Sequence, residues 1–366
     1  MILKNIKCVT GNYSTGCLCI YITCGANDEP RDKNGLSHLC EHFYIKLLSN
    51  KYLSAVRDVN FRCVGYTDYM YTIINILFTE NEINLNHVIK ALDVREKDLY
   101  IGQDYFEKSR TEVISECKIR NKCISESVIA NSYLTNGNVN YVPLGDVDSI
   151  CSINYKEFAK FFKHKYCDFQ CFFLLQNSYE SLEVRTLKHQ KAKNKSHKVS
   201  VAGKYLISDL CKQKIYYRIT IEDYVYNLCI AILEYIIGNK VLSNMDISFM
   251  KKSISEKFMY EIICIDSREE NIGAKIYDLI TGYELNESDI YQAKREIILH
   301  LKSNRLFDLN YAINNIINHF IYNENFLLND EQIRDVIVKI EDITFVQLQQ
   351  IKKEVFHAEY CILLGY

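Results

Sequence analysis

Two different apolar patterns follow each other near the start of the chain. Gly16–Gly25 alternates in the manner of a strand and is rich in small and β-branched apolar residues. A polar loop over Ala26–Asn34 follows, and the spacing over Gly35–Leu48 is then that of a helix. One side of this helix consists of Leu36, Leu39, Phe43 and Leu47. The sequence therefore predicts a strand, a loop and an amphipathic helix, in this order.

Short strands and helices are predicted along the rest of the chain. Phe61–Thr79 has the pattern of two strands joined by a polar turn at Thr67–Asp68. The elements predicted after it are helices over 83–92, 104–122 and 156–164 and a buried strand over 170–175. The order then starts again, with a strand over 204–221 and helices over 225–237, 289–304 and 310–322.

A basic polar stretch separates these two series. Lys188–Lys198 has the sequence KHQKAKNKSHK, in which Ala192 is the only apolar residue. A nucleic-acid-binding patch is the alternative interpretation, but no aromatic side chains for stacking on bases are interleaved. We therefore predict a domain over 1–187, a linker over 188–200 and a second domain over 201–366.

Two pairs of segments repeat at a similar separation. Ile153–Leu175 and Ile343–Gly365 share one apolar pattern, and Phe106–Glu116 matches Ile290–His300 at nearly the same separation along the chain. Internal similarity at two nearly equal separations is typical of a duplicated unit. We therefore expect an α+β fold of two homologous domains of roughly 180 residues, each with a mixed sheet covered by helices.

Composition limits the classes of protein that fit. The chain has 366 residues, a net charge of −2, 48% hydrophobic and 25% charged residues, which fits a globular protein and excludes a disordered one. It has no basic field that would collect nucleic acid or an anionic membrane. The start of the chain lacks an apolar signal core, no long apolar run is present, and the 15 cysteines form no Cys-x-x-Cys pair. We expect a cytoplasmic protein with reduced, mostly buried thiols and no membrane or nucleic-acid partner.

The candidate chemistry lies in the first predicted helix, at His38-Leu39-Cys40-Glu41-His42. Residues four apart on a helix lie one turn apart on the same face, so His38 and His42 can bind one zinc ion together. Glu41 lies near the same side, where a carboxylate can take the proton of a water molecule whose pKa zinc has lowered. This is the reversed zinc-peptidase pattern His-x-x-Glu-His. The alternative is a surface helix with two incidental histidines.

A catalytic zinc usually has three protein ligands and an open position. The predicted helix over 104–122 offers three carboxylates as the third ligand, which are Glu107, Glu112 and Glu116. The residues alone do not choose among them.

The arrangement resembles the pitrilysin family of zinc peptidases, peptidase family M16. The strand, the loop with Glu29 and the segment Asn34–His42 resemble that family's opening, and Phe106–Glu116 resembles its second signature. In that signature a Glu at a typical separation from the histidine pair completes the zinc site, and Glu116 takes that position. The resemblance implies His38, His42 and Glu116 as zinc ligands and Glu41 as the general base. Asn140–Gly145 also resembles the family pattern.

The first domain departs from the family pattern in two places. The family often has an acidic residue seven positions before the ligand Glu, where this chain has Ser109, and Glu112 one turn later is the expected substitute. The substrate-binding edge strand of the family usually carries an Asn-Ala pair, whose place we assign to Phe61-Arg62-Cys63.

The second domain departs from the family pattern as well. Family members carry an Arg and a Tyr there that hold the peptide carbonyl. Tyr260 resembles this Tyr, whereas the Arg is absent and Lys251 or Lys252 is nearby. A lysine cannot form the two parallel hydrogen bonds of a guanidinium, so another chain could supply this group.

The resemblance implies one half of a clamshell, and hence a homodimer or a heterodimer with a related subunit. The expected function is a zinc-dependent endopeptidase that cleaves short or unfolded peptides in a chamber, such as a ribosomally made precursor peptide. The alternative is a non-catalytic scaffold or partner subunit of the same family.

Overall fold

The structure is a computed structural model, and the following account covers the part of the chain that it describes. These residues are 6–10, 16–52, 61–78, 102–120, 127–132, 139, 141–167, 170–176, 206–207, 213–220, 224–255, 258–265, 272–304, 313, 330–357 and 361–364. The predicted linker over 188–200 and the predicted helix over 83–92 lie outside them, as does nearly all of the predicted helix over 310–322.

The chain divides into two compact units. Unit 1 comprises Met1–Ser127, Tyr141–Asn194 and Arg305–Ile317, and unit 2 comprises Val128–Asn140, Lys195–Asn304 and Asn318–Tyr366. The domain boundaries given above stay a prediction, because the linker that separates them is not described.

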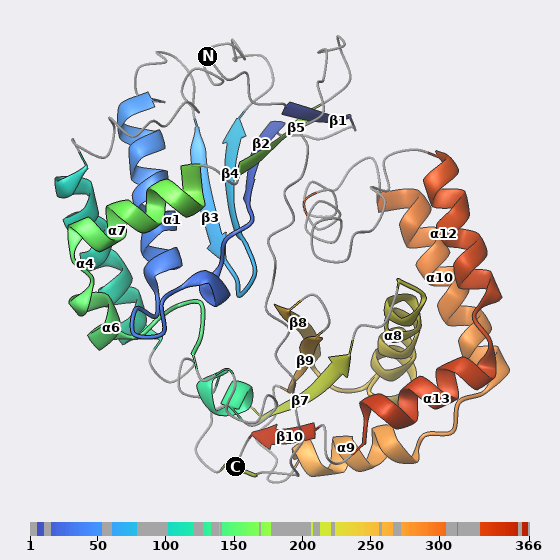
Figure 1. The fold of residues 1–366 in the computed structure, drawn as a ribbon. Helices are drawn as coiled ribbons and strands as arrows, with labels where there is room; N and C mark the ends of the chain where they lie inside the picture. Colours follow the sequence, from blue (N-terminus) through green and yellow to red (C-terminus); the bar gives the residue numbers. More distant parts are fainter. Residues whose placement is uncertain are drawn as a thin grey trace. The chain divides into compact units, whose positions relative to one another are not determined.

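Unit 1 is built on a mixed five-stranded sheet of described strands (Figure 1). Its strands are β1 (Ile6–Thr10), β2 (Gly16–Ile22), β3 (Arg62–Thr67), β4 (Thr72–Phe78) and β5 (Gln170–Gln176). They lie in the order β1-β5-β2-β4-β3, so that β3 is at the edge. β1 and β5 are parallel, and the other pairs are antiparallel.

Helices cover one face of this sheet (Figure 1). They are α1 (Leu36–Leu47), which continues into the π-helical turn η2 (Leu48–Tyr52), α4 (Gln103–Ile119), α6 (Val147–Ser152) and α7 (Tyr155–Phe161), which continues into η5 (Phe162–Cys167). Leu36, Leu39, Phe43 and Leu47 are all buried, as their spacing predicts. The ring of Phe43 contacts those of Phe158 and Phe162 with centroids 4.8 and 5.1 Å away. This packing fixes α1 against α7 and η5.

Unit 2 has a second mixed sheet, in the order β6-β10-β7-β9-β8. Its strands are β6 (Leu206–Ile207), β7 (Gln213–Thr220), β8 (Ile247–Ser255), β9 (Phe258–Ile265) and β10 (Cys361–Leu364). β6 and β10 are parallel, and the other pairs are antiparallel. Each strand thus has a counterpart in unit 1, in the same order and direction. The predicted duplication is confirmed at the level of topology.

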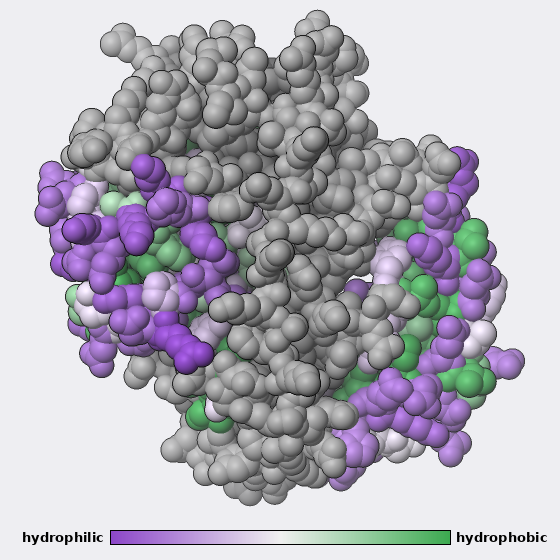
Figure 2. Space-filling view, in the orientation of Figure 1, coloured by the Kyte–Doolittle hydropathy of each residue, from purple (hydrophilic) through white to green (hydrophobic). Residues whose placement is uncertain are grey.

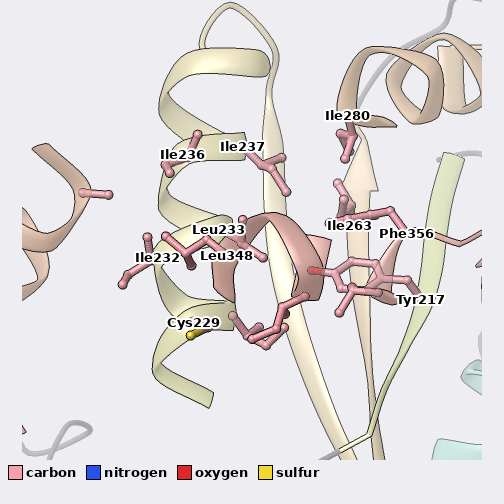
Figure 3. Packing of buried hydrophobic residues seen from close by; sticks show 14 of the residues in the cluster. Tyr217, Cys229, Ile232, Leu233, Ile236, Ile237, Ile263, Ile280, Leu348 and Phe356 are labelled. Atoms are coloured by element: carbon pink, nitrogen blue, oxygen red, sulfur yellow. The ribbon is translucent and has the colours of Figure 1, made fainter. Parts of the chain in front are cut away.

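The core of unit 2 forms around a strongly apolar helix. Its helices are α8 (Tyr224–Ile236), which continues into η6 (Ile237–Val241), α9 (Ile272–Gly282), α10 (Glu287–Asn304), α12 (Asp330–Asp342) and α13 (Phe345–Val355). Figure 3 shows Cys229, Ile232, Leu233 and Ile236 of α8 beside Leu348 of α13. Each fully buried aliphatic side chain of this kind contributes roughly 1.5–3 kcal/mol.

The prediction of one strand over 204–221 is wrong. The structure has two strands there, because β10 lies between β6 and β7 and pairs with both. It is parallel to β6 and antiparallel to β7, so the chain reverses direction between the two. The hairpin of β8 and β9 and the helices α9 and α12 were not predicted.

Polar side chains dominate the outer helices of unit 1 on the face shown in Figure 2, whereas apolar residues are interspersed along those of unit 2. Unit 2 has exposed apolar side chains that include Val338 of α12 and Val346 of α13, with 53% and 71% of their surface exposed. Within the described ranges, none of the helices combines the length and apolar character that crossing a bilayer requires.

Candidate metal centre

A capped helix start positions the His-x-x-Glu-His segment. Gly35 precedes α1 with a φ of 97°, a conformation that glycine adopts without strain. The carboxylate of Glu29 accepts hydrogen bonds from the backbone N–H groups of Gly35, at 2.8 Å, and Ser37, at 2.7 Å. Because the first N–H groups of a helix lack partners inside it, this carboxylate caps α1. The cap and the packing of Phe43 together fix the helix that carries His38 and His42.

Two histidines of α1 and one carboxylate of α4 converge. The Oε2 atom of Glu116 lies 3.5 Å from Nε2 of His38 and 3.6 Å from Nε2 of His42. The two imidazole rings are 4.8 Å apart between centroids. The structure thus brings together the three residues that the resemblance implied as ligands. Of the three carboxylates offered by α4, the one that faces both Nε2 atoms is Glu116.

The ring of His38 is oriented by the main chain. Its Nδ1 atom lies 3.1 Å from the carbonyl oxygen of Leu144, so Nδ1 carries a proton and donates it. Gly145, with a φ of 85°, packs against Gly35, and a Cβ on Gly145 would lie 2.5 Å from the Cα of Gly35. Two glycines at this close contact therefore hold the Leu144 carbonyl beside the histidine.

His42 and Glu116 are oriented by side chains. Nδ1 of His42 donates to Oε2 of Glu112 at 3.3 Å. The second oxygen of Glu116, Oε1, lies 3.2 Å from the guanidinium of Arg120 one turn later. The Nε2 atoms and the Oε2 atom are consequently directed at one another. This is how partners outside a metal site typically fix the tautomer and orientation of its ligands.

The electrostatics of these groups favour positive charge between them. Burial acts to lower the pKa of His38, but the hydrogen bond to Glu116 and the charge of Glu41 outweigh it, and the pKa is raised. The hydrogen bond from His38 lowers the pKa of Glu116 to about 2. Both Nδ1 atoms donate elsewhere, so when the two imidazoles are neutral, their Nε2 lone pairs face the carboxylate of Glu116 and repel it. A cation between them relieves this repulsion.

The three side chains fit a zinc ion. A tetrahedral zinc with bonds of about 2.0–2.1 Å separates its ligand atoms by roughly 3.3–3.4 Å. The distances of 3.5 and 3.6 Å from Glu116 to the two histidines are close to this value. Two histidines and one glutamate are also a ligand set of catalytic zinc sites with an open fourth position. His38, His42 and Glu116 could therefore hold the metal.

Glu41 lies beside these residues and is held by the edge strand. The ligand atoms of His38, Glu41 and His42 all lie within 4.8 Å of one another. Oε2 of Glu41 accepts a hydrogen bond of 2.7 Å from the hydroxyl of Thr67. Burial raises the pKa of Glu41, although the charge of His38 and the Thr67 hydroxyl act against it. A carboxylate with a raised pKa is suited to general base catalysis near neutral pH.

The edge strand approaches Glu41 at a glycine. A Cβ on Gly65 would lie 2.3 Å from Oε1 of Glu41, so no side chain fits there. Strand β3 pairs with β4 on one side and is the last strand of the sheet in the described residues. Gly65 and Thr67 are thus the strand residues beside Glu41. Of Phe61-Arg62-Cys63, the segment expected in the place of the family's Asn-Ala pair, Arg62 and Cys63 lie in the same strand, at its start.

Comparison with known proteins agrees with this arrangement. Residues 11–135 match the model of the insulinase family, peptidase family M16. This match spans 125 of the 366 residues, and it includes the His-x-x-Glu-His segment and Glu116. No curated protein matches the sequence.

Solved protease structures share the fold over nearly the whole chain. The first half of the periplasmic protease PqqL from Escherichia coli is 12% identical, with 96% of this chain and 86% of that chain covered and a TM-score of 0.67. A protease from Helicobacter pylori is 13% identical, with 97% and 94% covered and a TM-score of 0.70. A peptidase M16 inactive domain from Pseudomonas fluorescens is 12% identical, with 97% and 93% covered and a TM-score of 0.71. The α+β fold is therefore that of an M16 half.

The second unit lacks a histidine pair on the helix that corresponds to α1. Helix α8 contains no histidine, and His300 lies on α10. Tyr260 lies in β9, where its backbone pairs with Arg218 of β7 and Lys252 of β8. The side chains of these strand residues lie outside the described part of the structure, so the role of Tyr260 stays a prediction.

Several residues that shape the site were not singled out from the sequence. Thr67 and Gly65 hold Glu41, and the carbonyl of Leu144 holds His38. Lys46 binds Glu112, with 2.6 Å between Nζ and Oε1. The segment Asn140–Gly145 carried a signal, because it resembles the family pattern. Thr67 carried none, since its hydroxyl reaches Glu41 only once β3 packs on α1.

Proposed function

We propose that this chain is a zinc-dependent endopeptidase that cleaves short or unfolded peptides. The observation that supports it best is the position of Glu116, whose Oε2 atom faces Nε2 of both His38 and His42 at 3.5 and 3.6 Å. Zinc is preferred over manganese or cobalt because imidazole and carboxylate in a three-ligand set suit it, although the working ion is part of the proposal.

Zinc, when bound, acts as a Lewis acid that polarises the peptide carbonyl and makes water more acidic. The base for that water is Glu41, which is 5% exposed. Its raised pKa lets it accept the proton near neutral pH and then pass it to the leaving amine. Thr67 keeps the carboxylate in place during both transfers.

The peptide is expected to bind along β3. An edge strand has free backbone N–H and C=O groups, and an extended peptide can pair with them as a further strand. Gly65 places this edge directly beside Glu41. On the opposite face of the strand, Val64 and Tyr66 are 40% and 43% exposed and can contact alternate side chains of the peptide. Affinity would then come mainly from the main chain, with little sequence preference.

A second subunit is part of this proposal. An M16 half closes a chamber with another half, so we propose a homodimer or a heterodimer with a related subunit. Tyr260 is the proposed group that holds the peptide carbonyl. The backbone of Arg218 in β7 pairs directly with that of Tyr260 in β9. Arg218 is one candidate for the missing arginine, and a partner subunit is the other. Processing of a ribosomally made peptide would suit such a chamber.

A non-catalytic M16 subunit is the second candidate function. Two observations favour it, which are the serine at position 109 and the similarity to an M16 inactive domain. Such a scaffold has no need of His38, His42 and Glu116 in one place. Stoichiometric zinc in the purified protein would support the peptidase, and absence of zinc would support the scaffold.

The experiment compares zinc-loaded wild type with Glu41→Gln on a peptide library. Glutamine keeps the size of the side chain and its contact with Thr67 but cannot take a proton. We expect cleavage to fall by about 10²–10⁴-fold with zinc content unchanged. Glu107→Gln is the control, since Glu107 pairs with Arg110 and is half-exposed. Equal cleavage by wild type and Glu41→Gln would remove the proposed base.

A further inference from the structure

A row of hydrogen bonds extends from His42 away from the metal centre. Glu112 of α4 accepts from Nδ1 of His42 through Oε2, at 3.3 Å, and from Nζ of Lys46 through Oε1, at 2.6 Å. His42 and Lys46 lie one turn apart on α1, so this carboxylate bridges two residues of one helix from the neighbouring helix. The bridge joins α1 and α4 at the level of the site.

Ser109, which stands where the family often has an acidic residue, does not support the metal ligands in this way. Ser109 is fully buried on α4, and its hydroxyl has no hydrogen-bond partner among the described residues. Glu112 lies about one turn further along the same helix and contacts the ligand histidine directly. The carboxylate of α4 that contacts His42 is therefore at position 112 and not at position 109.

The two histidines are oriented by groups of different kinds. The Nδ1 atom of His38 donates to the main-chain carbonyl of Leu144, which is fixed by the fold. The Nδ1 atom of His42 donates to a side chain that is 50% exposed and is itself held by Lys46. A hydrogen bond at Nδ1 places the proton there and leaves the lone pair on Nε2. The orientation of His42 thus depends on two side chains that can be changed without opening the core.

We propose that Glu112, held in place by Lys46, is the positioning residue for His42. It selects the tautomer with the proton on Nδ1 and turns Nε2 toward Glu116, which lies 3.6 Å away. Lys46 directs the carboxylate of Glu112 toward the histidine, because its ammonium group holds the other oxygen. This inference rests on the proposed zinc site and extends it by one layer of residues.

Zinc affinity of the full-length protein tests the proposal. Metal-free protein is titrated with zinc in competition with a chelator of known affinity, for wild type, Glu112→Gln, Glu112→Leu and Lys46→Met. Removing a partner of this kind typically weakens metal binding by about 10–100-fold. We expect that loss for Glu112→Leu, which has no acceptor, and smaller losses for Glu112→Gln, which keeps one, and for Lys46→Met. The control, Glu107→Gln, removes a similarly exposed carboxylate of α4 and should leave the affinity unchanged.

The tautomer of His42 gives a second readout, which a merely structural role of Glu112 would not move. Nitrogen-15 NMR of the imidazole in metal-free protein should show the proton on Nδ1 in wild type and Glu107→Gln, and a mixture of tautomers in Glu112→Leu. A folded Glu112→Leu variant with wild-type zinc affinity would overturn this inference alone. A wild-type protein that does not bind zinc would overturn it together with the proposed function.

Discussion

The two units of the chain have the same sheet and differ in the helix that packs on it. Helices α1 and α8 each follow the corresponding antiparallel strand, β2 or β7, and each ends in a π-helical turn. Among the buried residues of α1 are Ser37, His38 and Glu41. Those of α8 are Tyr226, Leu228, Cys229, Ile230, Ile232, Leu233 and Ile236. The same architecture can therefore bury either ionisable or apolar side chains of the helix at this place.

This difference shows that the fold does not require the ionisable residues. Burial of an ionisable group costs free energy unless hydrogen bonds or a counter-charge compensate for it. Unit 1 contains those compensating partners, which include Thr67 for Glu41 and Leu144 for His38. The described core of unit 2 forms around apolar side chains (Figure 3). The buried ionisable residues of α1 are therefore better explained by a role in metal binding or catalysis than by a contribution to stability.

The largest effect is expected from removing a ligand. His42→Ala deletes one of three zinc ligands, and we expect zinc affinity to fall by about a thousandfold or more, beyond the 10–100-fold typical of outer partners. His300→Ala is the matched change in unit 2, on the helix that corresponds to α4, and should leave zinc binding unchanged. Isothermal titration with zinc measures both. Equal losses in the two variants would contradict the difference between the units.

A smaller effect is expected from filling the space beside the base. In Gly65→Ala the new Cβ would lie 2.3 Å from Oε1 of Glu41 and must displace it. Because misplacement of a catalytic group by about 1 Å can cost 10²-fold, we expect a loss of that order in kcat with zinc retained. Gly282→Ala in unit 2 is the control, since no atom lies within 4 Å of its added Cβ. If Gly65→Ala kept wild-type activity, the contact of β3 with Glu41 would not contribute to catalysis.

Lower pH should weaken zinc binding at unit 1. Protons compete with metal at Nε2 of His38, whose pKa is raised above its ordinary value of 6.5. Below that raised pKa the histidine is protonated, so affinity should fall by up to about tenfold for each unit of pH. Glu41→Gln removes a charge that raises this pKa, so its affinity should begin to fall only at lower pH. Titrations across the pH range with both proteins check this, and identical pH profiles would contradict it.

The smallest effect is expected from the hydroxyl that holds Glu41. The Thr67 hydrogen bond lowers the pKa of this carboxyl, so Thr67→Val should raise it further. The acidic limb of the kcat/KM profile should then move to higher pH, by roughly half a unit to one unit. Thr67→Ser keeps the hydroxyl and should keep the limb where it is. A limb that does not move in Thr67→Val would show that another group titrates.

Much of this site could be predicted from local sequence. A helix is enough to bring His38 and His42 together, because they are four residues apart. The apolar side of the same segment predicts that helix. The third ligand, Glu116, was harder to predict. Glu107, Glu112 and Glu116 are all on one helix, and local spacing does not choose among them. The choice came from resemblance, and the structure agrees with it in geometry.

The remaining features depend on tertiary packing. The contact of Gly65 with Glu41 depends on how β3 lies on α1, and no local pattern reports it. The same holds for Leu144, whose carbonyl reaches a histidine 106 positions earlier. The strand predicted over 204–221 was wrong for a similar reason, since the insertion of β10 between β6 and β7 joins the chain end to a distant segment.

Anomalous diffraction at the zinc edge, from crystals of the zinc-loaded wild-type protein, tests the central claim most directly. The account predicts one strong peak per chain, bounded by Nε2 of His38, Nε2 of His42 and a carboxylate oxygen of Glu116, and no peak within unit 2. A map without a peak at these three atoms, or with the ion bound elsewhere, would contradict the zinc peptidase.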